Sequence, residues 1–169
     1  MIAILARRRV PIGFVAGVVA LVLARPTWAA WCAGLVVAIA GEAIRIWAAG
    51  HLEKGREVTR SGPYRWTRHP LYVGSVVLAV GVVIASRSVV VAIVAAVYMV
   101  ATLTAAIRTE EAFLRRTFGD TYERYSRSEA TPMPRSFSLA RARRNREYRA
   151  VVGLAAGFGF LALKILLPI

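Results

Sequence analysis

The chain has 169 residues, of which 57% are apolar and 19% charged, and its mean hydropathy is +0.54. Soluble domains carry about 25% charged residues, and a small domain leaves much of its surface exposed to solvent. The composition therefore indicates that lipid is the solvent of this chain. The single cysteine, Cys32, excludes a secreted disulfide scaffold, and the hydrophobicity excludes a disordered chain.

The charge of the chain is strongly positive, because 23 Lys and Arg stand against 9 Asp and Glu, a net charge of +14. In a soluble protein such a balance would suggest a nucleic-acid partner. Here the arginines lie between apolar runs, as in membrane proteins whose cytoplasmic loops face anionic lipid. We therefore expect membrane lipids and a lipophilic substrate as partners, and no nucleic acid.

Apolar runs in chain order predict an all-α integral membrane protein with about five transmembrane helices in one domain, residues 1–169. The runs are Val10–Ala24, Trp28–Ala49, Leu71–Ala85, Ser88–Ile107 and Val151–Leu167. A spanning helix needs about 17–25 residues, so the first and third runs must borrow flanking residues or cross a thinned bilayer. The short links 25–27 and 86–87 predict two helical hairpins, the first run with the second and the third with the fourth.

Lysine and arginine alternate in number between successive loops. The N-terminal segment has three, the first loop only Arg25, the second loop five, the third only Arg87, and the fourth, Arg108–Arg149, eleven. By the positive-inside rule the N-terminus is cytoplasmic and the C-terminus lies outside. The loop before His69 and the end of the fourth helix then both face the cytoplasm.

A polar motif leads into the third apolar run, with the sequence Arg68-His69-Pro70-Leu71-Tyr72-Val73-Gly74. Pro70 suits the first helical turn, where its missing N–H is not needed, and this puts His69 at or beside the N-cap. A helix N-terminus attracts carboxylates and phosphates, and Arg68 strengthens that field. Tyr72 adds an aromatic face, and Gly74 allows a ligand or another backbone to come close. The alternative is an interfacial belt of aromatic and arginine side chains.

Acidic residues in or beside the apolar runs are further candidates. Glu110 and Glu111 lie at the cytoplasmic end of the fourth run, where the simplest interpretation is a helix exit with a Glu111–Arg115 pair. The functional interpretation is that one acid faces inward and binds a cationic or hydroxyl-bearing ligand. Glu42 and Arg45 lie inside the second run, where charges are costly and often functional, and their spacing allows them to pair with each other.

The fourth run is followed by apolar positions three or four residues apart, which predict an amphipathic helix at the cytoplasmic surface. These positions fall between Phe113 and Tyr125, and the segment Pro132–Arg135 then breaks the helix. The basic stretch Arg135–Arg149 that follows is expected to lie on anionic headgroups. With two histidines and one cysteine in the chain, no metal site is expected.

These motifs, in this order and spacing, resemble the isoprenylcysteine carboxyl methyltransferase and phospholipid methyltransferase superfamily. The residues that carry the resemblance are Gly62-Pro63-Tyr64-Arg65, Arg68–Gly74, Glu110-Glu111, Phe118-Gly119, Tyr122 and Tyr125. The resemblance extends over about 45–135, which we expect to be the catalytic core, and an additional C-terminal helix is expected at 151–167. The stretch Pro134-Arg135-Ser136-Phe137 departs from the family because it lacks a closing proline.

The resemblance implies a membrane methyltransferase that uses S-adenosylmethionine and has an active site facing the cytoplasm. It implies that the cofactor pocket is formed by His69, Pro70, Leu71, Tyr72, Gly74, Glu110 and Glu111. Carboxyl methylation of an isoprenylcysteine-like or other lipid acid is the first expectation. A carboxylate is ionised at neutral pH and needs alignment rather than a base; Arg45, Arg68 or Arg135 would bind it through the guanidinium.

Other functions remain open at this stage. An amine or phenol acceptor, as in phospholipid amine N-methylation, would need its proton removed, with Glu111 or His69 as the candidate base. Membrane sterol and fatty-chain reductases share a similar Gly-Pro-Tyr and Arg-His-Pro stretch and use NADPH, although they carry a different sequence where this chain has Glu110-Glu111. A third class is a non-catalytic membrane subunit. The oligomeric state is not indicated.

Overall fold

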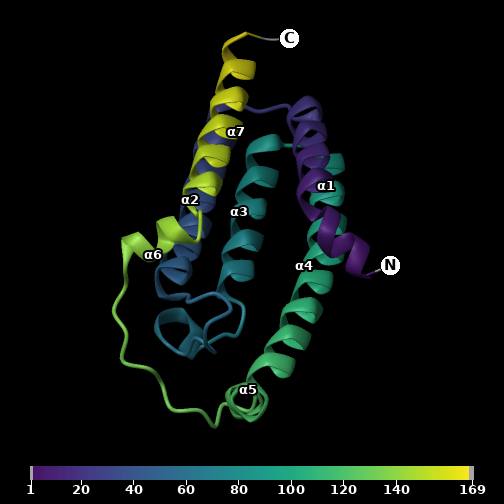
Figure 1. Ribbon diagram of the computed structural model, residues 1–169. Helices are drawn as coiled ribbons and strands as arrows, with labels where there is room; N and C mark the ends of the chain where they lie inside the picture. The colour runs from purple at the N-terminus through teal and green to yellow at the C-terminus, as the bar shows by residue number, and fades with distance from the viewer. Residues whose placement is uncertain (1, 168–169) are drawn as a thin grey trace.

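The computed structural model describes residues 2–167, and the side chains of residues 11–167. The described residues form helices and no strand, which confirms the all-α prediction (Figure 1). The helices are α1 (Ile2–Leu23), α2 (Trp28–His51), the 3-10 turn η1 (Gly62–Arg65), α3 (Pro70–Ser86), α4 (Val89–Phe118), α5 (Asp120–Ser126), α6 (Leu139–Arg144) and α7 (Tyr148–Leu166).

Three of these helices are long and apolar enough to cross a membrane: α2, α4 and α7. The apolar part of α1, Pro11–Leu23, and the whole of α3, Pro70–Ser86, are shorter. The 17 residues of α3 rise about 26 Å at 1.5 Å per residue, a few Å less than the ~30 Å hydrocarbon core. These are the two segments that the sequence already marked as short, and the count of five spans stays a prediction.

The tightest packing in the bundle is between α2 and α3, which present small residues to each other. A Cβ atom on Gly81 would lie 2.5 Å from the backbone N of Ala38 and 2.5 Å from the backbone O of Gly34. A Cβ atom on Gly41 would lie 2.4 Å from the backbone N of Leu78. Small residues let two helix backbones approach closely in a membrane, where dispersion rather than water drives association.

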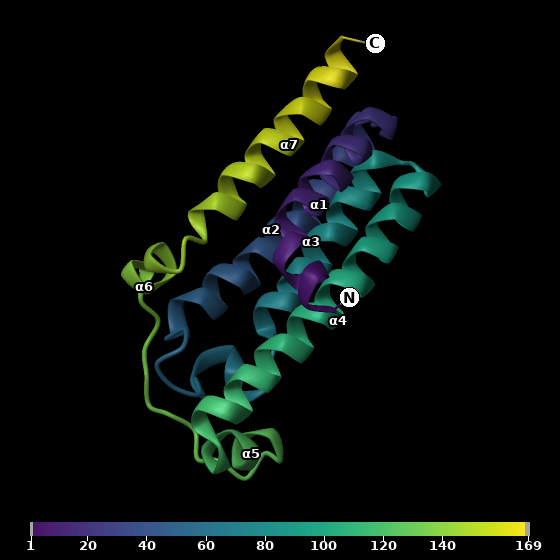
Figure 2. The ribbon, with the colours of Figure 1, turned by 45° about the vertical axis from the view of Figure 1, so that its right-hand side comes forward.

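The packing of α1 differs from the expected hairpin with α2. The link 24–27 is extended, and α1 lies along α4 instead (Figures 1 and 2). The physical reason is that the small-residue face of α2 is already occupied by α3. The expected pairing of α3 with α4 is present but is much less extensive than that of α2 with α3.

The C-terminal helix α7 is attached to the bundle at two levels. The indole N–H of Trp31 on α2 donates to the carbonyl O of Phe158 at 2.8 Å. The Lys164 ammonium donates to the carbonyls of Leu21, Val22 and Ala24 at 3.1, 2.7 and 2.8 Å. Lysine thus satisfies carbonyls that the end of α1 leaves without a helical partner.

Helix α4 is longer than the sequence suggested, because it continues past Ile107 without a break to Phe118. It contains no glycine or proline, and it ends at Gly119, whose φ of +47° favours glycine. The expected amphipathic helix is therefore divided. Its first part is the last turns of α4, and its second part is the seven-residue α5.

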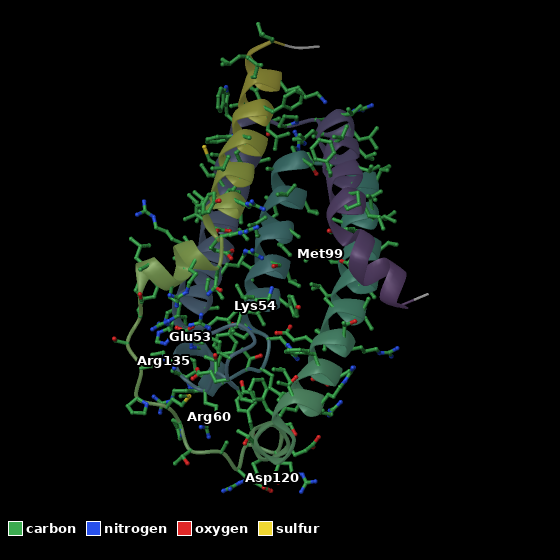
Figure 3. The ribbon with its side chains drawn as sticks, in the orientation of Figure 1. Glu53, Lys54, Arg60, Met99, Asp120 and Arg135 are labelled. Atoms are coloured by element: carbon green, nitrogen blue, oxygen red, sulfur yellow. The ribbon has the colours of Figure 1, made fainter. Side chains whose placement is uncertain are left out.

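The two ends of the bundle differ in chemistry. At one end, which we call the loop end, lie the loop 52–69, α5 and the segment 127–138 (Figure 2). Polar side chains of these segments gather there, among them Glu53, Lys54, Arg60, Asp120 and Arg135 (Figure 3). At the other end, which we call the link end, lie the short links 24–27 and 86–88.

Candidate active site

The start of α3 carries the contacts that join the two polar motifs of the sequence. Helix α3 begins at Pro70 with His69 as its N-cap residue, as predicted. The His69 Nε2 lies 3.2 Å from Glu111 Oε1, and the Tyr72 hydroxyl donates to Glu110 Oε2 at 2.8 Å. The rings of His69 and Tyr72 stack with centroids 5.6 Å apart. Both adjacent acids of α4 therefore face the first turn of α3.

Glu111 is the more heavily contacted of the two acids. Besides His69, its carboxylate lies 3.4 Å from Arg68 Nη1 and 3.4 Å from Arg115 Nη2. The pairing with Arg115 was predicted from the i,i+4 spacing and is confirmed. Only 18% of the Glu111 side chain is exposed, whereas 45% of Arg68 and 50% of Arg115 are exposed. Glu111 thus forms the inner part of a site whose arginines reach toward solvent.

Three tyrosines support this region from η1 and α5. The Tyr125 hydroxyl donates to the carbonyl O of Tyr64 at 2.8 Å, which ties α5 to η1. The ring of Tyr122, fully buried, lies 6.2 Å from that of Tyr125 and 5.7 Å from the Arg115 guanidinium carbon. Burial raises the pKa of Tyr125 to about 12 and also raises the pKa of Tyr122. Both phenols are therefore neutral at physiological pH.

Two buried polar atoms of this site, His69 Nδ1 and the Tyr122 hydroxyl, have no hydrogen-bond partner within the described part of the chain. His69 Nδ1 is buried, and no protein group accepts from it or donates to it there. A buried ring nitrogen without a hydrogen bond is costly in free energy. A ligand that forms a hydrogen bond with His69 Nδ1 would remove this cost and gain affinity. His69 is the N-cap residue of α3, and its carbonyl O accepts from the Tyr72 and Val73 N–H groups of the first turn.

A second cluster centres on Arg45 of α2. Its Nε lies 3.4 Å from Glu42 Oε2, the predicted pair, and its Nη2 lies 2.5 Å from Glu147 Oε1. Its Nη1 also donates to the hydroxyl of Ser75 on α3. The two carboxylates are 5% and 9% exposed, so two buried acids share one guanidinium.

Gly74 links this cluster to the His69 site, one turn along α3. A Cβ atom on Gly74 would lie 2.7 Å from Arg45 Cγ and 2.7 Å from the backbone O of Gly41. Of the two uses that the sequence allowed for Gly74, the structure shows the close approach of another helix. Pro70 is fully buried and Leu71 is partly buried beside these residues.

Arg135 lies in the segment that crosses the loop end. Its guanidinium forms two parallel hydrogen bonds to the Glu57 carboxylate, at 2.5 and 2.8 Å, and a third to the carbonyl O of His51 at 3.3 Å. The hydrogen bonds that Arg135 donates to Glu57 raise the pKa of Arg135. Among the contacts of the described residues, none joins Arg135 to His69 or Glu111, so the structure does not bring this candidate together with the others.

The basic stretch after Arg135 also has intramolecular partners. Arg141 Nε and Arg144 Nη2 each lie 2.9 Å from Glu53 Oε1, and the Asn145 amide donates to the carbonyls of Ala49 and Leu52 at 2.8 and 2.9 Å. The bond from Arg141 is the main reason that the pKa of Glu53 is lowered. We expected this stretch to lie on headgroups, and the structure adds that it fastens α6 to the end of α2.

Sequence reasoning missed Glu57, Ser75 and Glu147, since none of them lies in a recognisable motif. The small number of acidic residues could have indicated two of them. The chain has only nine acids, so each acid near an arginine-rich segment is a candidate ion-pair partner for an arginine. Within the described residues, no three His, Cys, Asp or Glu side chains lie close enough together to hold a metal ion.

Residues 42–121 match the family described as phospholipid methyltransferase. We call residues 42–121 the phospholipid methyltransferase segment. The superfamily resemblance inferred from the motifs is thereby confirmed. The phospholipid methyltransferase segment includes Arg45, His69, Tyr72 and the pair of acids on α4, and it ends before Arg135 and Glu147.

One curated relative is the nickel-cobalt-cadmium resistance protein NccN of Alcaligenes xylosoxydans xylosoxydans. It is 33% identical over 104 residues, which are 60% of this chain and 47% of NccN. The chain therefore spans about half the length of the curated relative it matches. No solved structure matches this chain.

Proposed function

We propose that this protein is an S-adenosylmethionine-dependent membrane methyltransferase with a lipophilic acceptor. The observation that carries the proposal is the pair of contacts between α3 and α4, His69 with Glu111 and Tyr72 with Glu110. They lie in the segment that matches the phospholipid methyltransferase family. The isoprenylcysteine-type specificity and the cytoplasmic orientation are further parts of the same proposal.

The residues at the start of α3 fit the groups of S-adenosylmethionine. When bound, this cofactor supplies a methyl group activated by a sulfonium. Its ammonium and ribose hydroxyls suit the Glu110 and Glu111 carboxylates, and its carboxylate suits the α3 N-terminus and Arg68. His69 Nδ1 offers an unused polar atom. The face of Tyr72, stacked on His69, suits a cation such as the sulfonium.

Our first candidate for the acceptor is a carboxylate on a lipid tail. It is ionised at neutral pH, so the protein has to orient it and exclude water rather than remove a proton. Arg68 is the best placed of the three candidate arginines, because it is half exposed and lies beside Glu111. Arg45 and Arg135 already bind carboxylates of this chain, Glu147 and Glu57 respectively.

A second candidate acceptor is an amine, and the Arg45 cluster favours it. Glu42 and Glu147 both contact the one guanidinium of Arg45, and Glu42 Oε1 is buried without a hydrogen-bond partner in the described part of the chain. Such a site suits a group that donates hydrogen bonds or carries positive charge. Methylation of an amine requires a free lone pair, so Glu111 or His69 would take its proton.

Titration of the purified full-length protein with S-adenosylmethionine and with NADPH, by isothermal calorimetry in detergent, tests the proposal. We expect saturable binding of S-adenosylmethionine and none of NADPH. Binding of NADPH alone would show that the protein belongs with the membrane reductases instead. Absence of binding by either, from protein that melts cooperatively, would favour a non-catalytic membrane subunit.

The pH dependence of methyl transfer distinguishes the two acceptor classes. A carboxylate is ionised across pH 7 to 9, so its rate should be flat over that window. An amine that must first lose a proton should react up to about tenfold faster per pH unit. Fatty-acid and long-chain amine acceptors measured side by side provide the matched comparison.

A further inference from the structure

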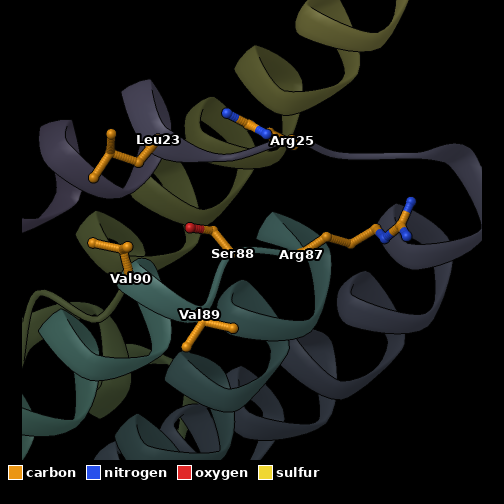
Figure 4. A pocket seen from close by; sticks show the side chains of 6 residues that line it. All are labelled: Leu23, Arg25, Arg87, Ser88, Val89 and Val90. Carbon is orange, nitrogen blue, oxygen red and sulfur yellow. The ribbon is translucent and has the colours of Figure 1, made fainter.

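A hollow of about 300 Å³ lies at the link end, remote from the His69 site. It forms where the end of α1, the end of α3 and the start of α4 meet, and it is lined by Leu23, Arg25, Arg87, Ser88, Val89 and Val90 (Figure 4). The backbone N–H of Arg25 donates to the carbonyl O of Ser86 at 2.8 Å, and this bond joins the link 24–27 to the link 86–88. The backbone of both arginines therefore lies at the same hollow, and their side chains are exposed.

The charge of these two arginines is not balanced by the protein. Within the described residues, neither guanidinium has a hydrogen-bond or ion-pair partner. All nine acids of the chain lie elsewhere, in the ranges 42–57 and 110–129 and at Glu147. The neighbouring ammonium of Lys164 is directed to three carbonyls of residues 21–24. The link end therefore carries two exposed positive charges that are open to an anion from outside the chain.

The rest of the lining indicates what kind of anion this is. Val89 and Val90 belong to the first turn of α4, a 30-residue helix, and a helix N-terminus favours phosphate and carboxylate oxygens. The Ser88 hydroxyl already accepts from the Val91 N–H. Leu23, Val89 and Val90 are also exposed apolar side chains. Guanidinium groups beside exposed apolar surface match a ligand that joins an anionic group to a hydrocarbon chain.

We infer that this hollow binds the phosphate of a phospholipid, in the membrane leaflet opposite the loop end. The two arginines and the α4 N-terminus contact the phosphate oxygens, and the apolar residues contact the first part of the acyl chains. A free phosphate ion could bind the same arginines, but it has no hydrocarbon part to contact the apolar side chains. The site is separate from methyl transfer and does not depend on the proposed function.

Native mass spectrometry of the full-length protein in detergent tests this inference. Three probes are compared: dioleoyl-phosphatidylglycerol, dioleoylglycerol with the same chains and no phosphate, and inorganic phosphate. We expect the phosphatidylglycerol complex to be retained at least tenfold better than the dioleoylglycerol complex. Millimolar inorganic phosphate should leave the lipid complex in place.

Two variants address the arginines separately. Arg25→Gln removes one charge, and Arg87→Gly removes the other at a position whose φ of +49° favours glycine. Arg87→Gly should therefore keep or raise the melting temperature while it weakens lipid retention. Loss of a charged hydrogen bond predicts about tenfold weaker retention in each variant.

Arg116→Gln is the matched control, because Arg116 is an exposed arginine at the loop-end terminus of the same helix α4. It should retain phosphatidylglycerol as the parent does. The inference is overturned if the double variant Arg25→Gln/Arg87→Gly retains the lipid as well as the parent. It is also overturned if dioleoylglycerol binds equally well, or if inorganic phosphate displaces the lipid.

Discussion

Glu147, the residue before α7, lies 2.5 Å from the guanidinium of Arg45 on α2, which stands 102 positions earlier in the sequence. Arg45 also pairs with Glu42, so it holds two buried carboxylates at once. The C-terminal helix is thus attached to the phospholipid methyltransferase segment by a charge contact next to Gly74 of α3. This contact makes Arg45 a structural residue whatever its role in turnover.

The charge count of this cluster predicts unequal effects of substitution on stability. Arg45→Gln leaves two buried carboxylates without a cation and should destabilise the protein by about 3–5 kcal/mol. Glu147→Gln leaves one carboxylate and one guanidinium, a balanced pair, and should cost about 1 kcal/mol. Denaturant unfolding in detergent measures both. Equal losses would show that the two acids do not share one arginine.

The conservative substitution Arg45→Lys separates folding from turnover. Lysine keeps the positive charge but cannot reproduce the guanidinium fork that reaches two acids and Ser75. We expect turnover to fall much more than the affinity for S-adenosylmethionine. If the cofactor affinity fell and turnover at saturation stayed normal, Arg45 would belong to the cofactor pocket instead.

The contacts at the start of α3 predict which residues govern cofactor binding. His69→Ala and Glu111→Ala should each weaken S-adenosylmethionine binding about tenfold or more, because each loses a charge-assisted hydrogen bond. Glu123→Gln is the control, since Glu123 shares Arg115 with Glu111 but lies outside this contact. Unchanged affinity in both alanine variants, with normal melting, would show that the pocket lies elsewhere.

The close packing of α2 and α3 predicts a contrast between two glycines. Gly81→Ala would push a methyl group into the backbone of α2 at 2.5 Å and should cost about 1–3 kcal/mol. Gly157→Ala on α7 places its methyl group where no atom lies within 4 Å, so stability should hold or rise slightly. Melting temperatures of the two variants in the same detergent test this contrast. Similar decreases in melting temperature would contradict the close packing of α2 and α3.

The lowered pKa of Glu53 predicts how the attachment of α6 responds to acid. A carboxyl group whose pKa is lower in the folded state stabilises the fold above its ordinary value of 4.5. That contribution is lost as the pH falls through the lower folded pKa. The melting-temperature gap between the parent and Glu53→Gln should be constant from about pH 7 to 5 and shrink below about pH 4.5.

A matched control for this titration is Glu129→Gln, which removes an exposed acid of the same loop end. Its melting temperature should follow that of the parent at every pH. A gap between parent and Glu53→Gln that widens on acidification would contradict the assigned direction of the pKa shift.

The positive-inside distribution predicts which end of the bundle faces the cytoplasm. We expect the loop end to be cytoplasmic, so in intact cells an impermeant thiol reagent should label Thr27→Cys and spare Glu129→Cys. Both positions are exposed, whereas Ser61 and Ser86 are buried and unsuitable for labelling. Cys32 is exposed and has to be replaced first. The reverse labelling pattern would invert the topology.

The sequence by itself located the long apolar helices, because apolar composition and helix-starting or helix-ending residues act over a few neighbouring positions. Pro70 starts α3 since proline needs no N–H partner in the first turn, and Gly119 ends α4 by adopting a positive φ. The order of the motifs also identified His69 and Tyr72 at the start of one helix, and Glu110 and Glu111 near the end of the next. The spacing within each of these two pairs is a local property of the sequence. The pairs Glu42–Arg45 and Glu111–Arg115 followed from helical periodicity.

Only the tertiary structure decided which helices touch and which charges meet across the chain. Short links suggested that α1 pairs with α2, but the small-residue faces of α2 and α3 pack together and leave α1 against α4. The partners Glu147 and Arg45, and likewise Glu57 and Arg135, are separated by 102 and 78 positions, and no local pattern relates them. Such pairs are set by helix packing, since burial makes each charge depend on whichever opposite charge the fold brings beside it.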